Sequence, residues 1–281
     1  MGGHRPTGGR PISADYVMGS GDPEMRRLAT LSALYEESTR RWLELAGLEA
    51  GMSVVDVGCG PGDVTLLAAE MVGPGGTVTG VDASPETLAL ARSRTERAGL
   101  RSVGFERADV TSWLPDRPVD AVVGRLILMH LPDPASTLAR LAGVVRPGGV
   151  VAFQDVVLTT RRTEPPLPLV EAFNGWLIET LRRSGRPVDM GLRLAAVFRT
   201  AGLPDPGLSV GAPVERGADA LGYSLVAGDV ASLLPRMEQL GVVTAAEVGP
   251  ETFEDRLRAE AAASDAVLLN PLMVGAWARP S

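Results

Sequence analysis

A glycine-rich turn beside an apolar run is the part of the sequence best suited to chemistry. Gly58, Gly60 and Gly62 follow the run at residues 53–57. Glycine is favoured in such a turn because it adopts backbone angles that other residues avoid and lets a ligand approach the main chain. A tight turn that binds nothing would use the same residues, so the glycines alone leave two interpretations open.

Two carboxylates further along the chain favour ligand binding. Asp82 ends the next apolar run, where it could accept hydrogen bonds from ribose hydroxyls. Asp109 ends the third run, where an adenine or another ring could lie. The turn and these two residues together predict a ligand that contains a nucleoside.

The charge around the turn indicates which nucleoside. The dinucleotide fingerprint G-x-G-x-x-G needs glycine where this chain has Asp63, and Asp56 lies just before the turn. A helix N-terminus holds phosphate by attracting negative charge, so two carboxylates would disfavour a pyrophosphate there. They suit a ligand with an ammonium and a sulfonium. We therefore expect a negatively lined crevice that prefers a cationic nucleoside without phosphate.

Alternating strands and helices must position these residues. We expect buried strands at residues 53–57, 77–82, 103–108, 119–125 and 150–156. Helices are expected at residues 24–48, after Asp63, after Ser84-Pro85 and after Asp133-Pro134. This alternation predicts a parallel sheet with helices on both faces, and ligands bind such sheets outside the carboxyl ends of the strands.

The second half of the chain is less regular. We expect helices at residues 165–183 and 189–202, two or three more within 218–263, and strands at 207–214 and 272–278. No Pro/Ser linker isolates a separate domain. We predict an N-terminal arm and lid helix at residues 1–48, a cofactor-binding core at 49–160, and substrate-cap helices with the last helix and strands of the sheet at 161–281.

Composition narrows the classes of function. The 281 residues carry a formal net charge of -7, which disfavours binding of nucleic acid or anionic lipid over the whole surface. One cysteine and two histidines are too few for a disulfide within the chain or a metal site built from these residues. We find no secretory signal or bilayer-spanning run. The sequence predicts a cytoplasmic protein with a small-molecule substrate and no metal, nucleic-acid or membrane partner; a homodimer is one option.

Several motifs in order resemble those of class I S-adenosylmethionine-dependent methyltransferases. The resemblance covers roughly residues 48–155 and rests on Val54-Val55-Asp56-Val57-Gly58-Cys59-Gly60-Pro61-Gly62, Gly80-Val81-Asp82, Ala108-Asp109-Val110 and Arg146-Pro147-Gly148-Gly149. Residues 124–134 resemble bacterial small-molecule methyltransferases of secondary metabolism, including antibiotic biosynthesis. The resemblance implies a Rossmann-like α/β fold with a seven-stranded, mostly parallel sheet, a reversed last strand, helices on both faces and helical cap insertions. It also implies S-adenosyl-L-methionine as the cofactor.

The resemblance also implies a set of cofactor-binding residues. The family's turn contacts the methionine half of the cofactor, the Asp82 position binds the ribose, and positions 109–110 border the adenine. The expected ligands are Tyr16, Asp56, Gly58, Cys59, Gly60, Gly62, Asp82, Ala83, Asp109, Val110 and Arg125. Tyr16 could close over the cofactor, or pack with its hydroxyl in water. Cys59 is expected to be a small packing residue rather than a nucleophile.

Methyl transfer needs few catalytic side chains. It requires the reacting atoms to be held in line, and a base only where the nucleophile carries a proton. His130, just after the fourth strand, is the candidate catalytic base, although it could instead cap a loop or line the substrate wall. Arg125 could bind a ligand carboxylate or form an ion pair with Asp120 or Asp155.

Other residues could shape the substrate site. Gln154 and Asp155 could face the substrate or be polar surface residues. Phe173, Trp176 and Leu177 could line an apolar pocket, although aromatic residues at this spacing more often belong to the core. An acidic substrate could be attracted by the arginines, although such runs usually form solvated surfaces: Arg161, Arg162, Arg182, Arg183 and Arg186.

We predict a methyltransferase of the EC 2.1.1 type that acts on a small, partly apolar metabolite, and three alternatives stay open. A cyclase or isomerase of the same fold could keep the cofactor without transferring methyl. A nicotinamide-dependent oxidoreductase is disfavoured by Asp63. A ligand-binding protein would bind the cofactor but show no turnover.

Overall fold

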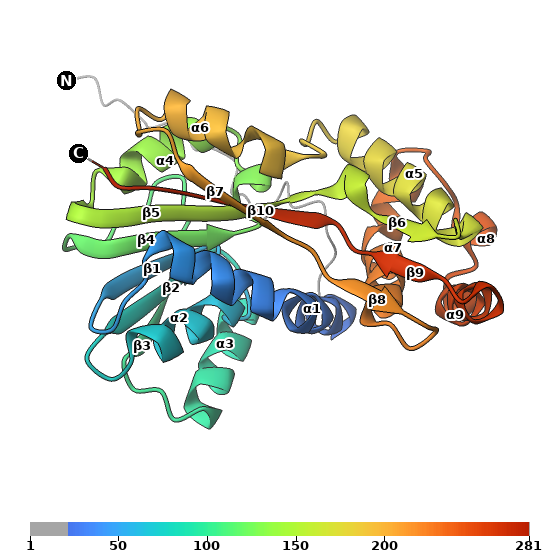
Figure 1. Cartoon of the computed structure of the whole chain (residues 1–281), viewed down its shortest axis with the longest axis horizontal. Helices are drawn as coiled ribbons and strands as arrows, with labels where there is room; N and C mark the ends of the chain where they lie inside the picture. The colour runs from blue at the N-terminus through green and yellow to red at the C-terminus, as the bar shows by residue number, and fades with distance from the viewer. Residues whose placement is uncertain (1–21, 281) are drawn as a thin grey trace, which may run out of the picture.

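A seven-stranded sheet forms the centre of the molecule, for which a computed structural model describes residues 22–280 (Figure 1). Its strand order is β3-β2-β1-β4-β5-β10-β7, with β1 to β5 parallel and β10 antiparallel to both of its neighbours. The strands are β1 (Ser53–Val57), β2 (Thr77–Asp82), β3 (Val103–Arg107), β4 (Val119–Arg125), β5 (Val145–Val157), β7 (Gly207–Gly211) and β10 (Leu272–Ala278). The mostly parallel sheet with a reversed strand near the chain's end is confirmed.

Helices cover both faces of this sheet. Figure 1 shows α1 (Asp22–Ala46), α2 (Asp63–Val72) and α3 (Pro85–Arg97) on one face, and α4 (Pro134–Ala142) and α6 (Leu194–Thr200) on the other. Neighbouring β1 residues point to opposite faces, because side chains alternate along a strand. Val54 packs in one buried cluster with Trp42 and Leu67, whereas Val55 packs in another with Leu138.

Two of the expected helix starts carry a side-chain N-cap. Ser84 precedes α3, and its Oγ accepts a hydrogen bond from the Thr87 backbone N–H at 3.2 Å. Asp133 precedes α4, and its Oδ1 accepts from the Ser136 backbone N–H at 2.9 Å. These caps satisfy backbone donors that the first helical turn leaves unpaired.

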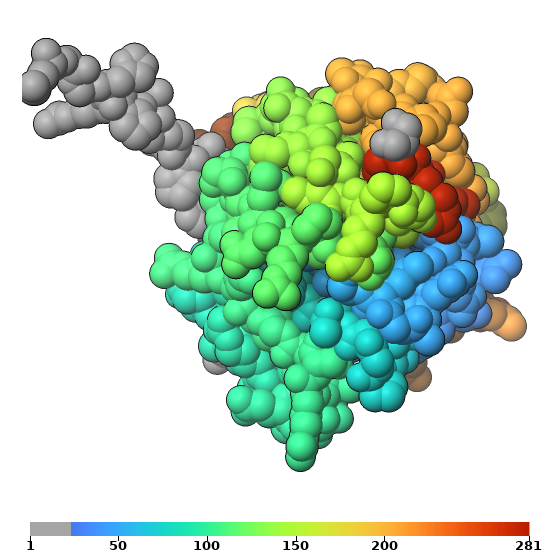
Figure 2. All heavy atoms as spheres, turned by 90° about the vertical axis from the view of Figure 1, so that its left-hand side faces the viewer, coloured from blue at the N-terminus to red at the C-terminus, as the bar shows by residue number. Residues whose placement is uncertain are grey.

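The end of the molecule opposite the strands' carboxyl ends brings distant segments together. Figure 2 shows the C-terminal segment there against the start of β5 and the end of α1. The Arg279 guanidinium donates to the Gly148 carbonyl. Gly148 lies inside β5, which begins at Val145 rather than at residue 150 as expected. The Arg-Pro-Gly-Gly segment is accommodated by a register shift against β4 between Val119 and Ala121.

A second packed region, here called the cap, lies beside the main sheet (Figure 1). Its helices are α5 (Pro168–Arg183), α7 (Leu221–Gln239), α8 (Ala245–Val248) and α9 (Phe253–Ser264). It also contains a three-stranded antiparallel sheet in the order β6 (Arg162–Glu164), β9 (Val267–Leu269) and β8 (Val214–Arg216). The small sheet was not predicted, and β7 and β8 were expected as one strand. Strands of three residues are too short for a periodic signal.

The chain crosses between these regions more than once. β5 leads from the main sheet toward the cap, and β10 returns to it after α9. Short 3-10 helices occur at Leu128–His130, Leu158–Thr160, Met190–Arg193 and Pro250–Thr252. The expected division of the chain after residues 48 and 160 stays a prediction.

Candidate functional site

The carboxyl ends of the parallel strands border a cavity of about 860 Å³. One part of its wall is the turn after β1 together with the segments that follow β2 and β3. The other part comes from α1, α5 and α7. One cavity therefore joins the strand ends, where the sequence predicts a ligand, to the cap.

Gly60 is the glycine of the turn that faces open space. Its φ is +51°, and a Cβ added to it would meet no atom within 4 Å. A Cβ at Gly58 would collide with the Ile127 side chain. Gly62 has a φ of +86°, precedes α2 and does not line the cavity. Gly60 thus suits close approach by a ligand, whereas Gly62 shapes the turn.

Asp82 connects the turn to the segment after β2. Its Oδ2 accepts from the Gly60 backbone N–H and its Oδ1 from the Ser84 backbone N–H, both at 2.9 Å. A carboxylate has about four acceptor sites, so these bonds leave Asp82 able to accept from hydroxyls of a ligand. Asp82 and Ala83 both line the cavity.

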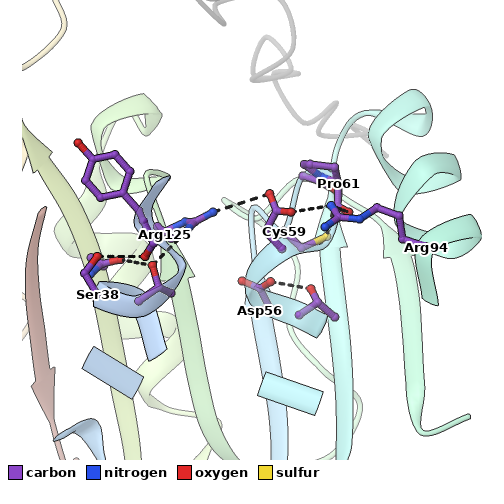
Figure 3. Close-up of polar contacts among 12 residues, drawn as sticks. Ser38, Asp56, Cys59, Pro61, Arg94 and Arg125 are labelled. Atoms are coloured by element: carbon purple, nitrogen blue, oxygen red, sulfur yellow. Dashed lines mark hydrogen bonds and ion pairs between the residues drawn. The ribbon is translucent and has the colours of Figure 1, made fainter. Parts of the chain in front are cut away.

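Asp63 is paired with two arginines, which corrects the expected charge of the crevice. Arg94 Nη1 lies 2.6 Å from Asp63 Oδ1, and Arg125 Nη2 lies 3.7 Å from Asp63 Oδ2. Figure 3 shows Arg94 and Arg125 reaching this position from opposite sides, and Arg94 also donates to the Pro61 carbonyl at 2.8 Å. Asp63 is therefore compensated within the protein and adds no net negative charge to the wall.

Arg125 has partners other than those expected. It donates to Thr39 Oγ1 at 3.0 Å, besides its contact with Asp63. Asp120 instead pairs with Arg146 at 2.8 Å, and Asp155 accepts from backbone N–H groups. The expected pairing of Arg125 with Asp120 or Asp155 is wrong. Arg125 lines the cavity, so binding of a ligand carboxylate stays a prediction.

Asp56 carries less charge than the sequence suggests. Its Oδ2 accepts from the Thr65 hydroxyl at 2.6 Å, and its Oδ1 is buried without a hydrogen-bond partner in the described part of the chain (Figure 3). Burial raises the pKa of Asp56 to about 7. Burial, aided by the Asp56 charge, also raises the pKa of the Cys59 thiol. A protonated thiol is a poor nucleophile, which agrees with a packing role for Cys59.

The other expected cofactor ligands divide into three groups. Val110 lines the cavity together with Ala83. Asp109 does not line the cavity. Its Oδ1 accepts from the backbone N–H and the hydroxyl of Thr111, at 2.8 and 2.7 Å. Tyr16 lies outside the described residues. Their roles toward a cofactor stay predictions.

His130 lies in the 3-10 helix after β4 and lines the cavity. Burial, together with the nearby charges of Arg186 and Arg27, lowers its pKa to about 4. Its imidazole is therefore neutral near pH 7 and has the form that accepts a proton, although as a weak base.

The acceptor end, here the part of the cavity under the cap, contains charged residues that the sequence analysis missed. Arg27 on α1 contacts both Glu24 oxygens at 2.8 and 2.6 Å and Asp229 Oδ1 on α7 at 3.2 Å. Glu24 and Arg27 have a local signal, three positions apart on a helix, but Asp229 is 202 positions from Arg27. The apolar walls here are Leu158, Leu177, Leu181, Leu225 and Met273.

Most of the expected substrate-facing residues lie elsewhere. Gln154 and Asp155 are buried away from the cavity lining, and Gln154 accepts from the Thr39 hydroxyl at 3.1 Å. Phe173 belongs to the buried cluster of the cap, and Trp176 packs against it near Phe253. These four residues therefore do not line the cavity, and Leu177 alone among the three apolar candidates does.

Among residues 22–280, no helix is long and apolar enough to cross a membrane. Within the same residues, no group of three or more His, Cys, Asp or Glu side chains is arranged to hold a metal ion.

Known proteins match the part of the chain that builds the turn. Residues 48–184 match a family model described as a methyltransferase domain. A trans-aconitate 2-methyltransferase of Methylobacterium radiotolerans is 41% identical over 122 residues, covering 42% of this chain and 45% of that relative. An aklanonic acid methyltransferase of a Streptomyces species is 36% identical over 130 residues, covering 46% and 59%. The chain thus matches about half the length of these relatives.

The fold has a solved counterpart. A candidate methyltransferase from Bacillus halodurans aligns over 87% of this chain and 100% of its own, with a TM-score of 0.57 and 18% identity. At that identity the likeness shows the fold alone. The sheet order, the ordered motifs and the family match agree with one another. Residues 48–184 are thus a methyltransferase domain that resembles the class I S-adenosylmethionine-dependent type, whose cofactor is S-adenosyl-L-methionine.

Proposed function

We propose that this protein transfers a methyl group from S-adenosylmethionine to a small-molecule acceptor in bacterial secondary metabolism. The observation that carries the proposal is a single cavity that joins the glycine turn of the methyltransferase domain to an apolar chamber under the cap. Both relatives described above are named for small organic acids, which supports an acceptor of similar size. A cytoplasmic location, a homodimer and the absence of nucleic-acid or membrane partners stay predictions.

The residues around the turn fit S-adenosylmethionine. Asp82 would accept from the ribose hydroxyls with the acceptor sites that its two backbone bonds leave open. The open space beside Gly60 would admit the methionine half. The unpartnered Asp56 carboxyl oxygen suits its ammonium, and Arg125 suits its carboxylate.

The chain's contribution to catalysis would be mainly positional. The bound cofactor supplies a methyl group on a positively charged sulfur, which departs as a neutral thioether. The apolar walls under the cap would exclude water and hold the acceptor in line with the turn. Positioning of this kind can lower a barrier by about 7–11 kcal/mol. Where the acceptor carries a proton, neutral His130 is the cavity residue proposed to take it.

Thermal unfolding tests the cofactor assignment. S-adenosylmethionine at a hundred times its dissociation constant should stabilise the fold by about 2.7 kcal/mol, whereas NAD and NADP should have no effect. Stabilisation by a nicotinamide cofactor alone would favour the oxidoreductase alternative and contradict the proposal.

Product analysis tests methyl transfer. With a panel of small carboxylic acids and phenols, mass spectrometry should show a gain of one methyl and formation of S-adenosylhomocysteine. An acceptor rearranged without a mass gain would indicate a cyclase or isomerase, and binding without turnover across the panel would indicate a binding protein. If His130 is the base, His130→Ala should collapse turnover while the cofactor affinity is unchanged.

A further inference from the structure

Two neighbouring arginines of the sequence have opposite environments. Arg162, in β6, is exposed to solvent. The side chain of Arg161 is 2% exposed, and the residue lines the acceptor end of the cavity. Arginine runs are usually solvated, so Arg161 is the member of this run whose burial requires explanation.

The hydrogen bonds of Arg161 are few and long. Its Nη1 donates to Asn174 Oδ1 and its Nη2 to Asp229 Oδ2, both at 3.5 Å, beyond the usual range for N–H···O bonds. Its Nε is buried with no hydrogen-bond partner among residues 22–280. A guanidinium has five N–H donors, and a buried donor without an acceptor is costly. The surroundings of the Arg161 guanidinium therefore lack a hydrogen-bond acceptor rather than a donor.

The neighbouring acids do not supply it. Asp229 Oδ1 is held by Arg27 at 3.2 Å, closer than Arg161 is to the other oxygen. Both oxygens of Glu24 are occupied by Arg27, and one also accepts from the Ser232 hydroxyl at 2.7 Å. The two arginines balance the charge of the two carboxylates, so the cluster has no uncompensated negative charge to attract a cationic ligand.

The cap also fixes the orientation of the guanidinium. Arg161 Cζ lies 4.9 Å from the ring centroid of Phe173, a side chain buried in the cap. Stacking on an aromatic ring holds the planar group in place with little loss of its donors. A carboxylate fits a guanidinium held in this way, because its two oxygens can accept two parallel N–H bonds from one guanidinium.

We propose that Arg161 binds a carboxylate of the acceptor molecule, so that the substrate class is an apolar carboxylic acid; this rests on the proposed methyl transfer. The carboxylate occupies the edge of the guanidinium that now makes long contacts, and the rest of the molecule lies against Leu158, Leu177 and Leu225. A phosphate monoester fits less well, because its second negative charge would lie close to Asp229 and Glu24.

Binding of a matched pair of probes tests this. Calorimetry on the full chain saturated with S-adenosylhomocysteine would compare 1-naphthoate with neutral 1-naphthamide, which has nearly the same shape. The wild type should bind the acid at least tenfold more tightly. Arg161→Met should abolish this preference, whereas the control Arg162→Met should retain it. Arg161→Lys keeps the charge but not the two parallel donors, so it should retain a reduced preference.

The outcomes separate this inference from the proposed function. Equal affinities for acid and amide in the wild type, no binding of either, or a preference that survives Arg161→Met would each overturn it. Should Arg161→Met not fold, an undiminished preference in Arg161→Lys would overturn it as well. Failure of S-adenosylhomocysteine to bind the wild type contradicts the proposed function, whereas its binding without an acid preference contradicts this inference alone.

Discussion

The turn region and the cap both place a carboxylate between two arginines, but in different surroundings. Asp63 lies between Arg94 and Arg125, and the Arg94 side chain is 30% exposed. Asp229 lies between Arg27 and Arg161, whose side chains are 7% and 2% exposed. If the carboxylate were lost, water could hydrate Arg94 in part, whereas both arginines beside Asp229 are buried. The cap cluster should therefore be the more sensitive of the two to loss of its central carboxylate.

The largest effect is expected from Asp229→Ala. Removing this carboxylate leaves buried Arg27 and Arg161 without their shared partner, and breaking such a pair typically costs about 3–5 kcal/mol of unfolding free energy. Urea unfolding would measure it. The affinity for S-adenosylmethionine should stay within twofold of the wild type, because Asp229 is at the acceptor end of the cavity.

The matched control is Asp205→Ala, which breaks an exposed pair with Arg199. No change in unfolding midpoint is expected there, because exposed pairs contribute little. Equal effects of the two variants would show that the cap cluster is not the desolvated network that its geometry indicates.

The second-largest effect is the loss of unfolding free energy that His130 causes in acid. His130 lies in the cavity wall between the turn region and the cap. Its pKa of about 4 in the folded protein lies below the ordinary 6.5, so the unfolded chain takes up a proton first on acidification. His130 therefore costs stability as pH falls from 6.5 to 4, up to about 3 kcal/mol. Unfolding at pH 7 and pH 4 should show a smaller loss in His130→Phe than in the wild type.

Comparison with the variant is needed because three buried carboxyls affect stability in the opposite sense. Burial raises the pKa of Asp56 and of Asp155 to about 7 and raises that of Asp229 as well, so their contribution to stability is full at acidic pH and is lost as the pH rises. They are common to both proteins and cancel in the difference. The same acid loss in the variant and the wild type would contradict the low pKa of His130.

The turn region was predictable from the sequence because its contacts are local and its glycines are constrained. The strand before Gly58, the helix N-cap at Ser84 and the position of Asp82 were all predicted and are observed. The ion pairs of Asp63 were not predicted. Arg94 comes from the next helix and Arg125 from a strand 62 positions after Asp63, and nothing in the glycine motif specifies either arginine.

The cap was far less predictable. Its central pair joins α1 to α7 across 202 positions, and no sequence pattern links the two residues. Gln154 and Asp155 looked like substrate contacts because they lie near the carboxyl end of β5. They face buried partners instead, since Thr39 and the backbone N–H of Met129 occupy them. Position along a strand was predictable, whereas the side chains packed against it were not.

Gly60→Val should show that the turn, unlike the cap, controls cofactor binding. The added side chain enters the open space of the cavity, so we expect at least a hundredfold loss of affinity for S-adenosylmethionine, about 2.7 kcal/mol. Gly99→Val is the matched control: Gly99 also has a positive φ, of +68°, and no atom within 4 Å of an added Cβ, but it is not in the cavity wall. Equal loss in both variants would attribute the effect to backbone strain.

The smallest effect compares two carboxylates of the turn region itself. Asp82→Ala should weaken cofactor binding at least tenfold, about 1.4 kcal/mol, because it removes both the expected ribose acceptor and the bond that holds Gly60. Asp109→Ala should change the affinity less, because the Asp109 carboxylate is bonded to Thr111 outside the cavity wall. Calorimetry on both variants would measure the affinity for S-adenosylmethionine. It would show whether Asp109 binds the cofactor, as the family motif implies, or not, as the cavity lining indicates. An equal loss would mean that the sequence assignment of Asp109 to the adenine end is right and that the cavity wall reaches further than its lining residues indicate.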